Sequence, residues 1–140
     1  MSRRIKVLVV DDSVVVRRLV SDALATDPAI EVVGTAPNGR VALSKIGQVN
    51  PDLITLDIEM PVMDGLSAAE EIGRERICPV VMLTAFSQKE LVERARDAGV
   101  MAYIVKPFTV SDVTPAIEVA TSRWAELKAL ESEVADLGER

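Results

Sequence analysis

The sequence predicts an α/β fold: a doubly wound, five-stranded parallel sheet with helices on both faces, followed by an extended C-terminal helix. Two observations lead to this prediction. Five short runs rich in β-branched residues alternate with segments that have helical spacing. The runs are also almost continuously apolar, which is typical of parallel strands that are buried on both faces. The predicted strands are residues 5–10, 30–35, 53–56, 80–83 and 102–105.

Local signals mark the helices that connect these strands. The first helix is expected to begin at Ser13, whose hydroxyl can cap it. Asn38, Gly65 and Ser87 introduce the second, third and fourth helices, and Gly99 suits the left-handed residue that ends the fourth. The apolar residues of the first helix that the spacing places along one side are Val16, Leu19, Val20, Ala23 and Leu24.

The last segment, residues 111–137, has apolar residues spaced by three or four, with charged residues on its other faces. At about 1.5 Å per residue such a helix is about 40 Å long, longer than the domain it closes. We therefore expect a domain over residues 1–124 and a helical extension over 125–140 that forms a coiled coil or a stalk toward a missing output module. The alternative is that residues 113–124 pack on the sheet and the remainder frays.

Composition excludes several classes of function. The net charge is -6 over 140 residues, so no basic stripe is available for direct nucleic-acid binding. No stretch approaches the roughly 20 apolar residues of a membrane span, and Asp11 and Asp12 interrupt the N-terminal apolar run, so we expect a cytoplasmic protein without a secretory signal. The chain has no histidine, which excludes Ser-His-Asp and Cys-His mechanisms. Its one cysteine, Cys78, is expected to be a buried thiol.

Polar residues follow four of the five predicted strands. Asp11 and Asp12 come after the first strand, Asp57 after the third, Thr84 after the fourth and Lys106 after the fifth. The carboxyl ends of parallel strands meet at one edge of a sheet, so these side chains are expected to converge. Carboxylates that converge repel one another, and oxygen ligands select a hard cation such as Mg²⁺.

An aspartate beside Mg²⁺ can act as a nucleophile toward a phosphoryl group, and Asp57 is the candidate. Lys106 could offset charge on the transferring oxygens, and the Thr84 hydroxyl could hydrogen-bond one of them. Each feature alone is more often structural, because paired aspartates commonly cap helices and a Lys-Pro pair commonly marks a turn. Their occurrence in this order, each after its own strand, favours the functional interpretation.

Four stretches carry a resemblance to a known family. Val9-Val-Asp-Asp-Ser13, Leu56-Asp-Ile-Glu-Met-Pro61, Leu83-Thr-Ala85 and Val105-Lys-Pro-Phe108 resemble the signature stretches of bacterial response-regulator receiver domains, over about residues 5–124. The part up to about residue 65 resembles receivers of chemotaxis methylesterases, and residues 81–140 resemble receivers of ANTAR-type antitermination regulators. The resemblance implies a flavodoxin-like sheet with the strand order 2-1-3-4-5.

The resemblance also implies residue roles. Asp57 would be the phosphorylation site, and Asp11, Asp12, Asp57 and the backbone carbonyl of Glu59 would bind Mg²⁺. Thr84, Lys106 and the aromatic Tyr103 would form the phosphate-binding switch, and Pro107 would follow a cis peptide bond. Two residues depart from the commonest receiver pattern, Phe86 and Glu59. Our hypothesis is that Phe86 shields the phosphoaspartate from water, and that Glu59 either pairs with Lys106 in the metal-free state or remains a solvated loop acid.

These roles define a phospho-accepting switch of a two-component system, which catalyses at most its own phosphorylation and dephosphorylation. Its expected partners are a sensor histidine kinase or phosphotransfer protein, a downstream protein or missing output domain, and a second copy bound through the C-terminal helix. Two alternatives stay open from the residues. One is a metal-dependent phosphatase in which Glu59, two residues after Asp57, acts as acid and base, although nothing in the chain forms a substrate cap. The other is an interaction or dimerisation module that never accepts phosphate.

Overall fold

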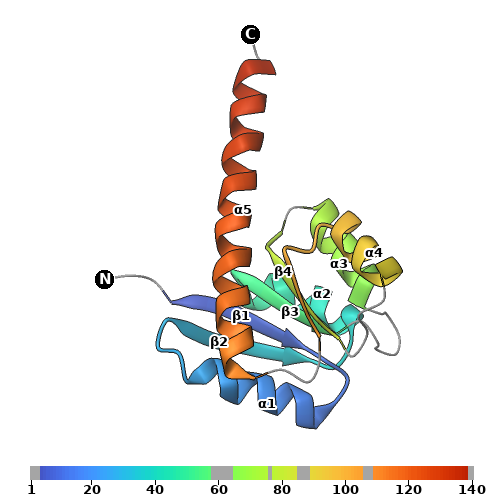
Figure 1. The fold of residues 1–140 in the computed structure, drawn as a ribbon, viewed down its shortest axis with the longest axis vertical. Helices are drawn as coiled ribbons and strands as arrows, with labels where there is room; N and C mark the ends of the chain where they lie inside the picture. The colour runs from blue at the N-terminus through green and yellow to red at the C-terminus, as the bar shows by residue number, and fades with distance from the viewer. Residues whose placement is uncertain (1–3, 58–64, 76, 85–88, 106–108, 139–140) are drawn as a thin grey trace.

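In the computed structural model, the residues described are 4–57, 65–75, 77–84, 89–105 and 109–138. Five parallel strands form one sheet in the order β2-β1-β3-β4-β5, which confirms the predicted topology (Figure 1). The strands are β1 (Ile5–Val10), β2 (Ile30–Ala36), β3 (Leu53–Asp57), β4 (Val80–Thr84) and β5 (Ala102–Val105). The helices are α1 (Val14–Ala25), α2 (Gly39–Val49), α3 (Gly65–Arg74), α4 (Lys89–Asp97) and α5 (Val110–Gly138).

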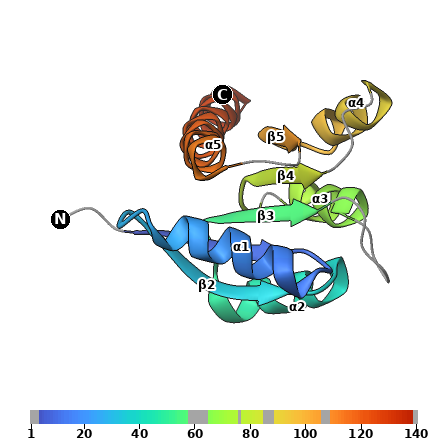
Figure 2. The same cartoon turned by 60° about the horizontal axis from the view of Figure 1, so that its bottom comes forward.

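Each face of the sheet carries its own hydrophobic cluster. Successive strand residues point to opposite faces, so Val7 and Val9 pack toward α1 and α5, whereas Leu8 and Val10 pack toward α2, α3 and α4. Figure 2 shows the helices distributed over the two faces in this way. Both faces of the central strands are therefore buried, which explains why their sequences are apolar without alternation.

Capping side chains mark the starts of α1 and α2, and a left-handed glycine follows the end of α4. The Ser13 hydroxyl accepts a hydrogen bond from the Val16 amide at 3.2 Å, and the Asn38 side chain accepts one from the Val41 amide at 2.9 Å. Gly99 follows α4 with φ of 89°, the left-handed conformation predicted for it. Helix α4 is described from Lys89, so its predicted start at Ser87 lies outside the described residues.

One prediction about α1 is wrong. Val20 and Leu24 are buried against the sheet, but Leu19 is 62% exposed and does not share their side. Val14 and Val15, in the first turn, are 68% and 67% exposed. The apolar spacing of α1 therefore serves two faces, one in the core and one on the surface.

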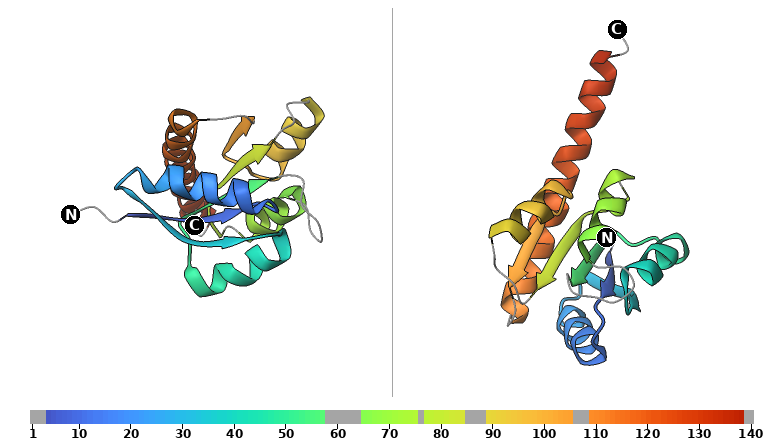
Figure 3. Two further views of the ribbon diagram at one scale, coloured as in Figure 1. Left: turned by 90° about the horizontal axis from the view of Figure 1, so that it is seen from below. Right: turned by 90° about the vertical axis from the view of Figure 1, so that its right-hand side faces the viewer.

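Helix α5 packs on the sheet at its base and then extends away from it. Val113, Ile117 and Ala120 are fully buried, whereas Leu130 is 59% exposed. Figure 1 and the right-hand view of Figure 3 show the helix continuing well beyond the sheet, which confirms the extended C-terminal helix. None of the described helices, α5 included, has the length and apolar content that crossing a bilayer requires.

Cys78 is a buried thiol, as predicted. It is 3% exposed, and burial raises the pKa of its thiol to about 12, with the negative charge of Asp52 contributing in the same direction. A thiol that stays protonated is a poor nucleophile, so Cys78 contributes packing rather than reactivity.

Candidate functional site

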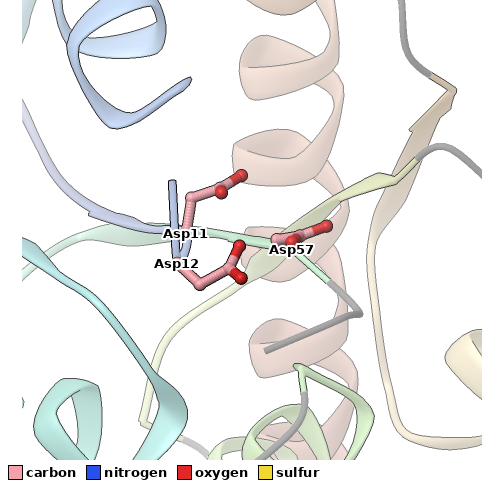
Figure 4. Close-up of side chains that lie close together, drawn as sticks. All are labelled: Asp11, Asp12 and Asp57. Carbon is pink, nitrogen blue, oxygen red and sulfur yellow. The ribbon is translucent and has the colours of Figure 1, made fainter. Parts of the chain in front are cut away.

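Three carboxylates meet where β1 and β3 end. Asp11 directly follows β1, Asp12 comes next, and Asp57 is the last residue of β3. One carboxylate oxygen from each lies within 4.8 Å of the others, and Figure 4 shows the side chains gathered at this edge of the sheet. The predicted convergence of the acids is thereby confirmed. Asp11 and Asp57 are 2% and 7% exposed, whereas Asp12 is exposed, so Asp12 forms the solvent side of the cluster.

Hydrogen bonds hold Asp11 from several directions. Its amide donates to the Ala36 carbonyl of β2 at 3.1 Å, and its carboxylate accepts a bond from the Ser13 amide at 3.0 Å. The guanidinium of Arg17 donates to the main-chain carbonyl of Asp11 at 2.8 Å. Sequence reasoning missed Arg17. The sequence signal that could have identified Arg17 is a cationic residue near the N-terminus of α1, where the helix dipole disfavours positive charge.

The cluster fits a hard divalent cation. Two like charges about 5 Å apart repel by on the order of 3 kcal/mol at an effective dielectric constant near 20, and Asp11 and Asp57 are too buried for water to screen them fully. A cation offsets this repulsion. Oxygens within 4.8 Å of one another can share an ion directly or through its bound water, and Mg²⁺ characteristically keeps several waters while binding one or two carboxylates.

The backbone brings Thr84 to the same edge. Asp57 pairs with Leu83 across the sheet, and Thr84 follows as the last residue of β4, paired with Val105 of β5. The main chain of Thr84 therefore lies at the predicted edge of the sheet, although Thr84 ends β4 and does not follow it. The Thr84 side chain lies outside the described part of the structure, as do four other predicted site residues: Glu59, Phe86, Lys106 and Pro107.

Tyr103 lies in the middle of β5, paired with Met82 of β4. Its side chain is half-buried and packs against the cluster formed with α2, α3 and α4. It also lines a groove of about 170 Å³ between α4, β5 and α5, together with Arg96, Met101 and Arg123. Tyr103 therefore lies beside this groove, and β4 lies between its strand and β3, which carries Asp57.

Known proteins resemble the chain over nearly its whole length. It is 50% identical over 135 residues to the transcriptional regulatory protein PdtaR of Mycobacterium tuberculosis, covering 96% of this chain and 65% of that protein. It is 49% identical over 117 residues to a protein-glutamate methylesterase/protein-glutamine glutaminase of a Nocardioides species, covering 81% of this chain and 32% of that protein. The chain thus spans less than two thirds of each relative, one a transcriptional regulator and the other a methylesterase.

Solved structures agree with the topology. The chemotaxis protein CheY4 of Vibrio cholerae superposes with a TM-score of 0.77 at 32% identity, covering 84% of this chain and 98% of that structure. Residues 7–118 match the response regulator receiver domain family, a span that includes β1 to β5 and the three converging aspartates. The chain therefore belongs to the response regulator receiver domains, the phospho-accepting switches of two-component signalling.

Proposed function

We propose that Asp57 is the phosphoryl acceptor of this receiver and that Asp11, Asp12 and Asp57 hold Mg²⁺ for the transfer. The observation that carries the proposal is the cluster of three carboxylate oxygens within 4.8 Å of one another at the ends of β1 and β3. Asp57 is the member at the end of a central strand, whereas Asp11 and Asp12 share one loop. This division suits one nucleophile and two metal-binding acids.

The transfer needs no general base, because a carboxylate carries its nucleophilic lone pair near neutral pH. An Asp57 oxygen forms a bond to phosphorus while the bond between phosphorus and the donor's leaving atom breaks, giving an acyl phosphate. The bound cation would supply charge compensation for the transferring oxygens. By resemblance, the backbone carbonyl of Glu59 would complete the ion's ligands, and Lys106 and Thr84 would contact the phosphoryl group afterward.

The direct test is phosphorylation by acetyl phosphate with Mg²⁺, followed by intact mass measurement. The parent should gain one phosphoryl mass, and Asp57→Asn should gain none. Asp52→Asn is the matched control, since Asp52 lies just before the other end of β3 and should leave the gain intact. A parent that remains unmodified both with acetyl phosphate and with a phosphorylated kinase would overturn the proposal.

A protein donor must cover the edge of the sheet around the acids to bring a phosphohistidine to Asp57. The exposed apolar residues Val14, Val15 and Leu19 of α1 adjoin this edge, because α1 begins directly after Asp11, Asp12 and Ser13. We propose that the histidine kinase or phosphotransfer partner contacts this surface. Exposed apolar groups beside a site commonly mark protein contacts.

This proposal separates two phosphodonors. Val15→Glu should slow transfer from a phosphorylated kinase by tenfold or more while leaving acetyl phosphate labelling unchanged, because a small donor needs no docking surface. Val119→Glu on α5, an exposed apolar residue on another helix, is the control and should affect neither reaction. Equal slowing with both donors would instead indicate damage to the site.

Phosphorylation is proposed to shift an existing equilibrium between two arrangements of the loops beside the site, with the readout carried by α4, β5 and α5. Tyr103, Arg96 and Arg123 line the groove on that surface. Residues 125–140 would act as a helical extension toward an output module, or pair with a second copy as a coiled coil. Sedimentation of the full chain, with and without a phosphate mimic, distinguishes a monomer from a dimer.

Receiver domains are signalling switches and not catalytic enzymes, so the family does not favour the phosphatase alternative. The presence of three converging acids likewise disfavours a module that never accepts phosphate. Turnover of a generic phosphoester would revive the first alternative, and failure to bind Mg²⁺ at millimolar concentration would revive the second.

A further inference from the structure

We infer that Arg17 is a positioning residue of the cation site, which holds the loop carrying Asp11 and Asp12 in its cation-binding geometry. The inference rests on the proposed function of this cluster. Arg17 is half-buried in α1, and its guanidinium donates to the main-chain carbonyl of Asp11 at 2.8 Å. This contact joins the helix to the loop that precedes it.

The location of Arg17 is unfavourable for the helix itself. Position 17 is four residues after the cap residue Ser13, within reach of the positive end of the helix dipole, and α1 has no acidic residue in its first turn. A cation there costs the isolated helix stability. A local conflict of this kind is expected at functional positions, where another interaction offsets it. In this structure the offsetting interaction is the bond to Asp11.

The hydrogen bond from Arg17 leaves the Asp11 carboxylate available for a cation. It ends on the carbonyl oxygen of Asp11 and so occupies neither oxygen of the carboxylate. The Asp11 amide is bonded to Ala36 of β2, and the carboxylate accepts from the Ser13 amide. With Arg17 these contacts fix the residue at its amide, its carbonyl and its side chain. Asp11 is therefore preorganised for the cation, so less conformational entropy is lost when the cation binds.

Two effects of Arg17 on cation affinity have opposite signs, so the inference can be tested. As a nearby positive charge, Arg17 repels a cation, and its removal would tighten Mg²⁺ binding. As a clamp on the loop, its removal would weaken Mg²⁺ binding. A charge-assisted hydrogen bond is worth roughly a tenfold change or more in an equilibrium constant. We expect the clamp to dominate because the bond ends on the main chain of a residue that carries one of the ligands.

The experiment measures Mg²⁺ affinity by isothermal titration calorimetry on the full chain. Arg17→Ala should bind Mg²⁺ about tenfold more weakly than the parent. Arg17→Lys, which keeps a charged donor, should remain within about threefold of the parent. Arg18→Ala is the matched control, since it removes the same charge from an exposed neighbouring position and should change affinity less than twofold. If Arg17→Ala does not fold, Arg17→Gln replaces it, with the same expectation.

A second measurement separates positioning from general damage. The rate of labelling by acetyl phosphate should require about tenfold more Mg²⁺ for half its maximum in Arg17→Ala, yet reach the parental rate at saturation. Equal or tighter Mg²⁺ binding by Arg17→Ala would overturn the inference, as would equal weakening in Arg17→Lys or a lowered rate at saturating Mg²⁺. A parent that binds no Mg²⁺ would overturn the proposed function as well, whereas a parent that binds it beside an unaffected Arg17→Ala would overturn this inference alone.

Discussion

Replacement of Gly73 by alanine tests the packing of α3 against the segment that follows α4. A Cβ atom built on Gly73 would lie 2.5 Å from the carbonyl oxygen of Ala98 and 3.6 Å from its carbonyl carbon. Real Cβ atoms essentially never approach another heavy atom closer than 3.0 Å, and the obstacle is backbone, which cannot rotate away. The two segments must therefore separate by at least about half an ångström to admit the methyl group.

The expected cost follows from two opposing terms. Overpacking a close contact costs about 1–3 kcal/mol. Alanine in place of glycine inside a helix recovers up to about 1 kcal/mol. Gly47→Ala on α2 isolates the second term, because a Cβ at Gly47 meets nothing within 4 Å. We therefore expect Gly47→Ala to stabilise the protein by up to about 1 kcal/mol. The free energy of unfolding of Gly73→Ala should be lower than that of Gly47→Ala by about 1–3 kcal/mol.

Urea unfolding of the parent and both variants, followed by circular dichroism, measures these differences at constant m-value. The comparison between the two variants is decisive, since both make the same chemical change in a helix. Equal free energies of unfolding for Gly73→Ala and Gly47→Ala would refute the close approach of α3 to Ala98. A drop confined to Gly73→Ala would establish it as a constraint on where α4 ends.

Three further changes probe the core and the caps. Thr55 is fully buried, and within the described residues its hydroxyl has no hydrogen-bond partner. Thr55→Val should therefore raise the free energy of unfolding, measured in urea, by about 1 kcal/mol. An unchanged or lower value would contradict this expectation. Cys78 has its pKa raised from 9.0 to about 12, so the folded protein holds the thiol proton more tightly than the unfolded chain does. This contribution to the free energy of unfolding is complete below pH 9 and is lost between pH 9 and 12 at about 1.4 kcal/mol per pH unit. The difference in free energy of unfolding between the parent and Cys78→Ala, measured across this range, should fall with the same slope. Asn38→Ala removes the cap of α2 and should lower the free energy of unfolding by about 1 kcal/mol, while Asn38→Asp should keep most of it.

The sequence predicts the sheet well because each strand has its own local signal. Continuous apolar runs identify the strands, and residues that directly follow a strand must lie at its carboxyl edge. The sequence alone therefore predicts that Asp11, Asp12 and Asp57 lie together. The same reasoning positions the main chain of Thr84. The strand order itself came from the family resemblance and not from the residues.

The sequence does not predict features of the structure that depend on contacts between distant segments. Leu19 fits the helical spacing of α1 but faces outward, because the sheet covers only one side of that helix. The register shift between β1 and β2 leaves Val33 without a paired residue, and no local signal marks it. Asn50 ends α2 in the left-handed conformation with φ of 47°, although asparagine is only one of the residues that can do so. The bond from Arg17 to Asp11 likewise depends on the angle at which α1 leaves β1.

The shape of α5 makes it a lever arm. Its base packs against the sheet and α1 through Val113, Ile117 and Ala120, whereas its C-terminal portion runs clear of the sheet in the right-hand view of Figure 3. From Ala120, the last residue of this base, to Gly138 the helix spans about 27 Å at about 1.5 Å per residue, so a tilt of about 10° at the base displaces the tip by about 5 Å. A repacking too small to alter the fold of the sheet is thereby amplified at the far end. Movement at the base of α5 would therefore reach its far end without any contact between that end and the three converging aspartates.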